Sequence, residues 1–437
     1  MKKSVFVISL CLGIFASRAF AAEVSIKGNI NQRYDTSDNY FLVQSPTGVT
    51  VKSTTSGTFN FLAQTLDTSY LLNTNASYFK YLGPGADDAG SLTSGTPAST
   101  TFSINHTANE LTAFNFVSSW SRADVATTNL AQTGVATGSG STNTFLVGGG
   151  ITHDLSRIDT INWTVNATTT TFTDPSSTPY NDYTSSISWN RTLTPTTNWV
   201  NSVSFDWFDQ DDPAKSQRLF WRATTGARSQ VSPRLSVYGN IGLVFVNSYQ
   251  KNPTQSATPV IPSTSVPFQP IVGAGTGWVG DVGLSYRLLK TTSISFNAAN
   301  SIIPTLGGAL QQNFSFGGAL NHEINSLSNV SFTAQFSMTN ASSQASQFAA
   351  TTGGSSEFFS ASVNYGYKLT RDWYSNLSYT YLQRNDSTGT VSANMVFVSL
   401  SYDFTLLGNP NAINKATEQR ARQRARESIG QVFPGIY

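Results

Sequence analysis

The sequence predicts an all-β protein, a transmembrane antiparallel β-barrel, and three observations support this. Apolar and polar residues alternate with a period of two in runs of about ten residues, such as Val330–Met338 and Val396–Phe404. Aromatic residues gather at the ends of runs, as Trp199 and Trp207 do. Short and long connections alternate, which is typical of barrels with short periplasmic turns and long extracellular loops.

The composition excludes several other classes. Of the 437 residues only 11% are charged and 12% are aromatic, whereas a soluble domain has roughly 25% charged residues. Disorder requires low hydrophobicity and high charge, so this chain is not disordered. The apolar run Val5–Ala16 is shorter than the ~20 residues of a transmembrane helix, which argues against a helical membrane protein.

The first 21 residues have the pattern of a secretory signal peptide. Lys2 and Lys3 form a basic start, Val5–Phe15 is an apolar core, and Ala19–Ala21 ends in a small-x-small cleavage site. We therefore expect residues 1–21 to be removed after export across the inner membrane.

Removal of this leader changes the charge and the cysteine count. Three cations leave with it, so 23 basic residues remain against 24 acidic ones, a net charge of −1. A nucleic-acid partner is therefore not expected. Cys11, the single cysteine, lies in the leader, so we expect neither disulfides nor thiolate metal sites in the mature chain.

The expected strands follow in order from the alternating runs. They begin with residues 23–34, 56–65, 70–82 and 99–106 and end with 356–368, 372–384 and 392–404. Long Gly/Ser/Thr/Pro-rich connections separate hairpins, at Gly83–Ala98, Ala123–Asn143, Tyr249–Gly275 and Thr339–Ser355. The short connections that we expect at the periplasmic side are Thr65–Ser69, Thr107–Glu110, Asp154–Arg157, Thr192–Thr196, Gln230–Pro233, Leu289–Thr291, Glu323–Leu327 and Leu369–Arg371.

Eight short turns require nine hairpins, and hence about 18 strands. Counts of 16 or 20 also fit, because Asn39–Ser53 could contain one further short hairpin. The barrel is expected to span residues 22–404. Residues 405–437 form a basic periplasmic tail, which could be a free extension, a partial plug or a docking segment for a periplasmic partner.

Charged residues in the polar phase of the strands are the candidate pore lining. A midplane Arg or Lys that faces lipid costs roughly 2–4 kcal/mol, so these residues should face the lumen. There they hydrate the lumen or give it weak selectivity. The candidates are Asp206, Arg222, Arg228, Asp281, Arg287, Lys368, Arg384 and Asp403.

Other candidate sites have simpler explanations. His106, His153 and His322 each occur where a strand enters a short turn, which favours turn hydrogen bonding over catalysis. The acidic group Asp206, Asp209, Asp211 and Asp212 could hold a divalent cation, but its spacing matches no calcium loop. A solvated outer loop is the preferred interpretation, and we expect no metal, cofactor or enzymatic activity.

The last strand resembles the terminal aromatic strand by which Gram-negative outer-membrane barrels are recognised for insertion. Its apolar phase ends at an aromatic residue, and the expected signal comprises Val398, Leu400, Tyr402 and Phe404. The whole mature chain is similar to porin-like barrels, most of all to poorly characterised ones encoded beside exopolysaccharide systems. Asn190–Trp199 and Tyr367–Tyr381 resemble their turns. One departure is that 33 residues follow Phe404, although the aromatic residue usually ends the chain.

These observations predict a water-filled outer-membrane channel for passive diffusion of small hydrophilic solutes through a lumen lined by Ser, Thr and Asn. The alternative is an export conduit for an extracellular polysaccharide, and an outer-membrane hydrolase is a third, weaker hypothesis. Expected partners are outer-membrane lipid and lipopolysaccharide and the barrel-assembly machinery. Periplasmic export components on the tail and a homo-oligomer are left open.

Overall fold

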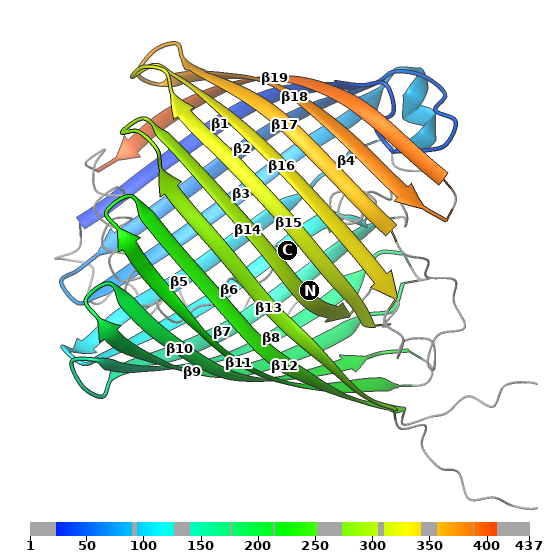
Figure 1. Cartoon of the computed structure of the whole chain (residues 1–437). Helices are drawn as coiled ribbons and strands as arrows, with labels where there is room; N and C mark the ends of the chain where they lie inside the picture. Colours follow the sequence, from blue (N-terminus) through cyan, green and yellow to red (C-terminus); the bar gives the residue numbers. More distant parts are fainter. Residues whose placement is uncertain are drawn as a thin grey trace, which may run out of the picture.

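The computed structural model is a closed antiparallel β-barrel (Figure 1). It describes residues 23–89, 94–125, 140–174, 177–212, 215–250, 273–304, 310–341, 356–387 and 389–408. The expected signal peptide, residues 1–21, and the tail from residue 409 onward lie outside the described residues.

The barrel strands are 12 to 19 residues long, and each pairs with its sequence neighbours. They are β1 (Glu23–Ser37), β2 (Thr50–Gln64), β3 (Thr68–Leu82), β5 (Ala98–Asn109), β6 (Thr112–Asp124), β7 (Ser141–Asp154), β8 (Asp159–Phe172), β9 (Tyr180–Thr194), β10 (Thr197–Gln210), β11 (Ser216–Ser232), β12 (Leu235–Gln250), β13 (Gly273–Arg287), β14 (Thr292–Pro304), β15 (Leu310–Glu323), β16 (Ser328–Ala341), β17 (Ser356–Lys368), β18 (Trp373–Asp386) and β19 (Gly389–Leu407).

The loop after β3 contains two further short elements. The 3-10 helix η2 (Pro84–Ala89) is followed by β4 (Ser94–Gly95), which pairs with β3. Among the described residues, no helix is long and apolar enough to cross a membrane.

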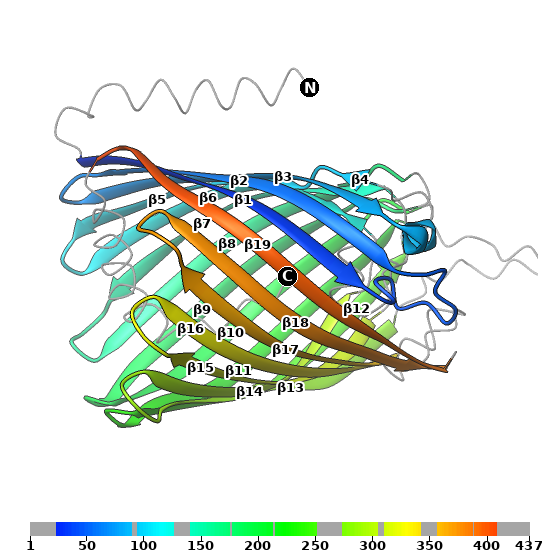
Figure 2. The ribbon, with the colours of Figure 1, turned by 90° about the horizontal axis from the view of Figure 1, so that it is seen from above.

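The barrel closes because the first strand pairs with the last. β1 pairs with β2 on one side and with β19 on the other, and Figure 2 shows β1 and β19 side by side. Without the two-residue β4, the closed sheet has 18 strands. The predicted number is confirmed. The segment Asn39–Ser53 contains no additional hairpin: it is a loop followed by the start of β2.

All eight expected short connections are turns, and they lie together at one end of the barrel (Figure 1). The strand ends that the long connections join lie at the opposite end. The arrangement inferred from connection lengths is therefore confirmed. At this loop end β18 stops at Asp386 and β19 begins at Gly389, so a short connection also joins two strands there, and connection length alone does not distinguish it from the turns.

Several strands are longer than the sequence pattern indicates. β2 begins at Thr50 rather than at residue 56, because Thr-rich residues continue the pairing without an apolar alternation. β19 continues to Leu407, so Thr405–Leu407 belong to the last strand and not to the tail. Lys27 pairs with Thr405 and Ile26 with Leu407, with a register shift between them. The two leucines at 406 and 407 break the alternation, but the backbone still pairs.

The two faces of the sheet differ in composition. Large apolar side chains in one phase remain exposed, such as Ile241 (62%), Trp278 (52%) and Phe332 (45%). In the other phase Phe208 and Val244 are buried against side chains of neighbouring strands. Side chains converge on the concave face of a barrel, so the exposed apolar phase is the outer face.

Aromatic residues form belts on this outer face. All eight tryptophans of the sequence lie in the outward phase. Four of them lie toward the turn ends of their strands, namely Trp163, Trp189, Trp199 and Trp373. The other four lie toward the loop ends, namely Trp120, Trp207, Trp221 and Trp278. Two aromatic belts that flank an apolar band are typical of transmembrane barrels.

At the seam, where β1 pairs with β19 and closes the barrel, the residues on each face of the sheet suit the environment of that face. Outside, Gly28 pairs with Phe404, and a Cβ atom on Gly28 would lie only 2.3 Å from that ring. The glycine thus makes room for the terminal aromatic residue of the predicted insertion signal. Inside, Asn29 Nδ2 donates a hydrogen bond to Asp403 Oδ1 at 2.6 Å.

The seam gives a direct test of closure. Asn29 and Asp403 are paired neighbours, and paired residues of antiparallel strands have Cα atoms ~4.5–5.5 Å apart, within the range of a disulfide. A variant with Asn29→Cys and Asp403→Cys should therefore cross-link on mild oxidation in the outer membrane, which changes its mobility on a denaturing gel. The control pair Asn29→Cys and Asp281→Cys should not cross-link, and an open seam would leave both pairs uncross-linked.

Candidate functional site: the lumen of the barrel

Short polar side chains hydrogen-bond to one another along the inner face. Asn31 Nδ2 donates to Ser401 Oγ at 2.7 Å, and the hydroxyls of Ser202 and Thr224 lie 2.7 Å apart. Each bond joins neighbouring strands, so it holds its side chains flat against the wall. These bonded side chains present hydroxyl and amide groups that water can hydrate.

The eight charged residues predicted as pore lining all occupy the inward phase of their strands, but they do not form one site. Toward the loop ends are Asp206, Arg222 and Arg384, and toward the turn ends are Arg228, Asp281, Arg287, Lys368 and Asp403. Their role in solute selection stays a prediction.

The structure brings two groups of these residues together. Asp206 lies opposite Phe220, two residues from Arg222, so this carboxylate and guanidinium are diagonal neighbours on β10 and β11. Also on β11, but nearer its turn end, Arg228 has its guanidinium 5.7 Å from the ring centroid of Tyr238 on β12. Asn240 Nδ2 donates to Asp281 at 3.2 Å. This stretch of wall therefore carries both acidic and basic groups.

The remaining predicted residues are separate from these groups. Arg384 is buried and forms an ion pair with Asp386, with Nε and Oδ2 2.9 Å apart. Arg287 and Lys368 are exposed at the turn ends of β13 and β17.

Sequence reasoning missed other charged residues of the inner wall. Arg33 and Asp35 form an ion pair on β1, in the same phase as Asn29 and Asn31. Both lie in the polar phase of their strand, so the rule that charged residues in this phase face the lumen could have identified them. Lys52 was missed for a different reason, because the predicted second strand began only at residue 56.

A loop folds into the extracellular end of the lumen. It comprises residues 38–49 between β1 and β2, and Figure 2 shows it beside η2 at the loop end of the barrel. Tyr40, Phe41 and Leu42 are at most 7% exposed. They pack on inward-facing apolar residues of three strands, β3, β17 and β19: Phe79, Tyr81, Phe358, Val391 and Ala393. We call residues 38–49 the inner loop.

Aromatic rings dominate the contact between this loop and the wall. The ring centroids of Tyr40 and Phe41 lie 5.2 and 5.0 Å from that of Tyr81, both in edge-to-face arrangements. Lys52 completes the cluster: its ammonium lies 4.4 Å from the centroid of Phe79 and donates to Tyr40 Oη at 3.2 Å. A cation over ring faces is attracted by their quadrupoles, which holds the loop against β2 and β3.

Polar contacts fix both ends of the inner loop. Asp38 accepts two hydrogen bonds from Asn394, one from its backbone N–H and one from its Nδ2, both at 2.7 Å. At the other end Asp88 accepts a bond from the backbone N–H of Thr47 at 3.0 Å, which ties the loop to η2. Leu42 adopts a positive φ of 52°, in a turn closed by Asn39.

The opposite wall has an apolar cluster of its own. β11 is nine strands from β1 in both directions round the barrel. Near its loop end Phe208, Phe220 and Val244 are buried together, and Tyr180 packs on them with its ring 4.8 Å from Phe208. The inner loop and this cluster therefore face each other across the entrance.

The three histidines have a repeated structural role, as expected. His106 Nδ1 lies 2.9 Å from Thr68 Oγ1, His153 Nδ1 lies 2.9 Å from Thr112 Oγ1, and His322 Nδ1 lies 2.8 Å from Thr292 Oγ1. In each pair the threonine is the first residue of its strand, directly opposite the histidine. The prediction of turn hydrogen bonding in a repeated hairpin is confirmed.

The acidic group on β10 and the following loop does not converge on one point. Asp206 faces inward, whereas Asp209 faces outward and accepts a bond from Gln217 Nε2 at 3.0 Å. Asp211 pairs with Lys215, and Asp212 accepts a bond from the backbone N–H of Ser216 at 2.7 Å. Among the described residues, no group of three or more His, Cys, Asp or Glu side chains is arranged to hold a metal ion.

Comparison with known proteins gives structural similarities only. The sequence matches no family model, and no curated protein is similar to it. The structure is similar to the Acinetobacter baumannii protein OccAB2, with a TM-score of 0.47, 9% identity, and 89% and 100% of the two chains covered. It is also similar to Pseudomonas aeruginosa OccK2, with a TM-score of 0.45, 9% identity, and coverage of 88% of this chain and 98% of that one. A third similar structure is the copper transporter OprC, with a TM-score of 0.48, 9% identity, and coverage of 85% of this chain and 64% of that one.

The chain is an outer-membrane β-barrel. This conclusion depends on its own geometry: 18 antiparallel strands close without an edge, the outer face is apolar between two aromatic belts, and turns and loops are segregated.

Releasing the inner loop should change the channel. Asp38→Ala removes the acceptor of both bonds from Asn394, which tie the inner loop to β19. In planar bilayers this variant should give larger and noisier single-channel currents than the parent protein. The control, Asp372→Ala in the turn after β17, should leave the currents unchanged. Identical currents from Asp38→Ala and the parent would show that the loop does not restrict the entrance.

Proposed function

We propose that this protein is a passive channel through which small hydrophilic solutes cross the outer membrane. The observation that carries the proposal is the hydrogen-bonded hydroxyl and amide groups on the inner face of a closed 18-stranded barrel. Barrels of 16–18 strands leave an aqueous lumen, whereas 8-stranded barrels are filled by side chains.

The inner wall supports weak rather than strong ion selectivity. It carries charges of both signs, some of them in ion pairs such as Arg33 with Asp35 and Arg384 with Asp386. A wall of balanced charge creates little net potential along the axis, so neither cations nor anions are strongly favoured. Neutral hydroxylated solutes suit such a lining, because Ser, Thr and Asn exchange hydrogen bonds with them as readily as with water.

Selection by size would take place at the extracellular entrance. There the inner loop narrows the lumen on the side of β1 to β3, and the apolar cluster around Phe208 borders it on the opposite side. A solute would enter between these surfaces and then move along the polar wall down its concentration gradient.

The histidines give no support to a hydrolase. Each is held by a threonine of the neighbouring strand at the turn end of the outer face. This arrangement explains all three without a catalytic role.

Solute passage through the purified full chain in liposomes tests the proposal. Swelling rates should fall steadily with the size of neutral sugars, from monosaccharides to tetrasaccharides. Bilayer currents under a salt gradient should reverse close to zero potential. Impermeability to monosaccharides would contradict the channel function, and preferential passage of long polysaccharide chains would favour the export conduit instead.

A further inference from the structure

One ion pair lies on the outer face of the barrel. Arg191 on β9 lies between the exposed residues Ile187 and Leu193 of the same phase, while Asn190 is buried in the other phase. Arg191 lies opposite Asp159 in the register of β8 and β9. In the turn-side halves of the described strands, these are the only Lys, Arg, Asp or Glu residues in the outward phase.

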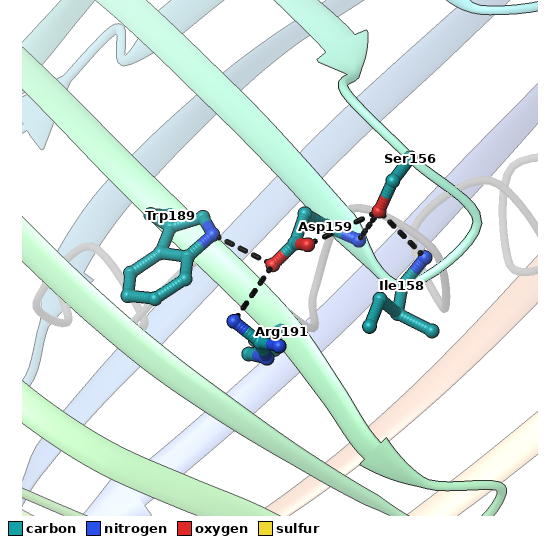
Figure 3. Close-up of polar contacts among 5 residues, drawn as sticks. All are labelled: Ser156, Ile158, Asp159, Trp189 and Arg191. Atoms are coloured by element: carbon teal, nitrogen blue, oxygen red, sulfur yellow. Dashed lines mark hydrogen bonds and ion pairs between the residues drawn. The ribbon is translucent and has the colours of Figure 1, made fainter.

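Asp159 is held mainly by groups other than Arg191 (Figure 3). Its Oδ1 accepts a bond from Trp189 Nε1 at 3.0 Å, and its Oδ2 accepts one from Ser156 Oγ at 3.1 Å. Ser156 Oγ in turn accepts the backbone N–H groups of Ile158 and Asp159. The carboxylate is thus fixed by the turn and by the indole.

Arg191 is held only loosely by this carboxylate. Its Nη1 lies 4.0 Å from Asp159 Oδ1, which is too far for a hydrogen bond, and its side chain is 43% exposed, compared with 19% for Asp159. A guanidinium has five N–H donors in a planar fork. Among the described residues, none accepts a hydrogen bond from this fork, and its nearest carboxylate oxygen is the one of Asp159 at 4.0 Å.

The surroundings place this guanidinium at the depth of lipid headgroups. Trp199 lies opposite Arg191 in the register, and its ring centroid lies 5.5 Å from that of Trp189. Tryptophan rings concentrate at the membrane–water interface, where one end is apolar and the other is wet. Trp189 and Trp199 each lie within five residues of the turn end of their strand, so these two rings mark the periplasmic interface.

We propose that Arg191 binds the phosphate of a glycerophospholipid in the periplasmic leaflet, with Trp189 and Trp199 against the glycerol and upper acyl chains. A phosphate diester offers two oxygens that match the guanidinium fork in a bidentate contact. Asp159 orients the site through Trp189 and limits its affinity, because its negative charge repels the phosphate. This inference depends on the membrane orientation of the barrel and not on the channel function.

Native mass spectrometry of the full chain, titrated with phosphatidylglycerol in detergent, tests the proposal. Arg191→Gln should weaken lipid binding about tenfold or more, as expected for the loss of a charge-assisted hydrogen bond. Arg371→Gln, which removes an exposed arginine from the turn after β17, should bind like the parent. Asp159→Asn keeps the size and acceptor of the side chain but removes its charge, and it should bind the lipid more tightly.

Each alternative outcome has a defined meaning. Unchanged binding by Arg191→Gln would overturn the proposal, and so would an equal loss in Arg371→Gln, which would indicate a general effect of net charge. Weaker binding by Asp159→Asn would also contradict it, since the carboxylate would then be part of the site. Displacement of the lipid by millimolar inorganic phosphate would show a site for free phosphate instead of a lipid headgroup.

Discussion

Closure of the sheet is the constraint on which the rest of this structure depends. Lipid offers no partner for backbone N–H and C=O groups, so a sheet can span a membrane only when no strand is left at an edge. Here β1 pairs along its length with both β2 and β19. The details of the seam serve this pairing: Gly28 leaves space for Phe404 on the lipid side, and Asn29 bonds Asp403 on the inner side.

Once the barrel is closed, the period of two along each strand separates two environments. Apolar and aromatic side chains of one phase meet lipid, and small polar side chains of the other phase meet the lumen. The phase of a charged residue therefore shows whether its side chain faces the lipid or the lumen. Facing inward, Arg33 pairs with Asp35 and Arg384 with Asp386, whereas Arg191 and Asp159 face outward at the level of the tryptophan belt.

Much of this architecture can be predicted from the sequence because it is set by local rules. Turn spacing gave 18 strands, and alternation assigned Phe332 to the outside and Arg222 to the inside. The inner loop could not be predicted in this way. Tyr40, Phe41 and Leu42 are buried by Phe79, Tyr81 and Phe358, which are distant in sequence and come together only when the barrel closes. Likewise β19 reaches Leu407 through backbone pairing with β1, which requires no apolar pattern.

The central claim is that one face of each strand lines a water-filled lumen across the whole membrane. It is tested most directly by single-cysteine variants along β16, since the sequence has no cysteine other than Cys11. With a water-soluble thiol reagent, labelling should alternate: the reactive positions should be Asn329, Ser331, Thr333 and Gln335, and the unreactive ones Val330, Phe332, Ala334 and Phe336. Labelling of the second set, or labelling without a period of two, would contradict the account.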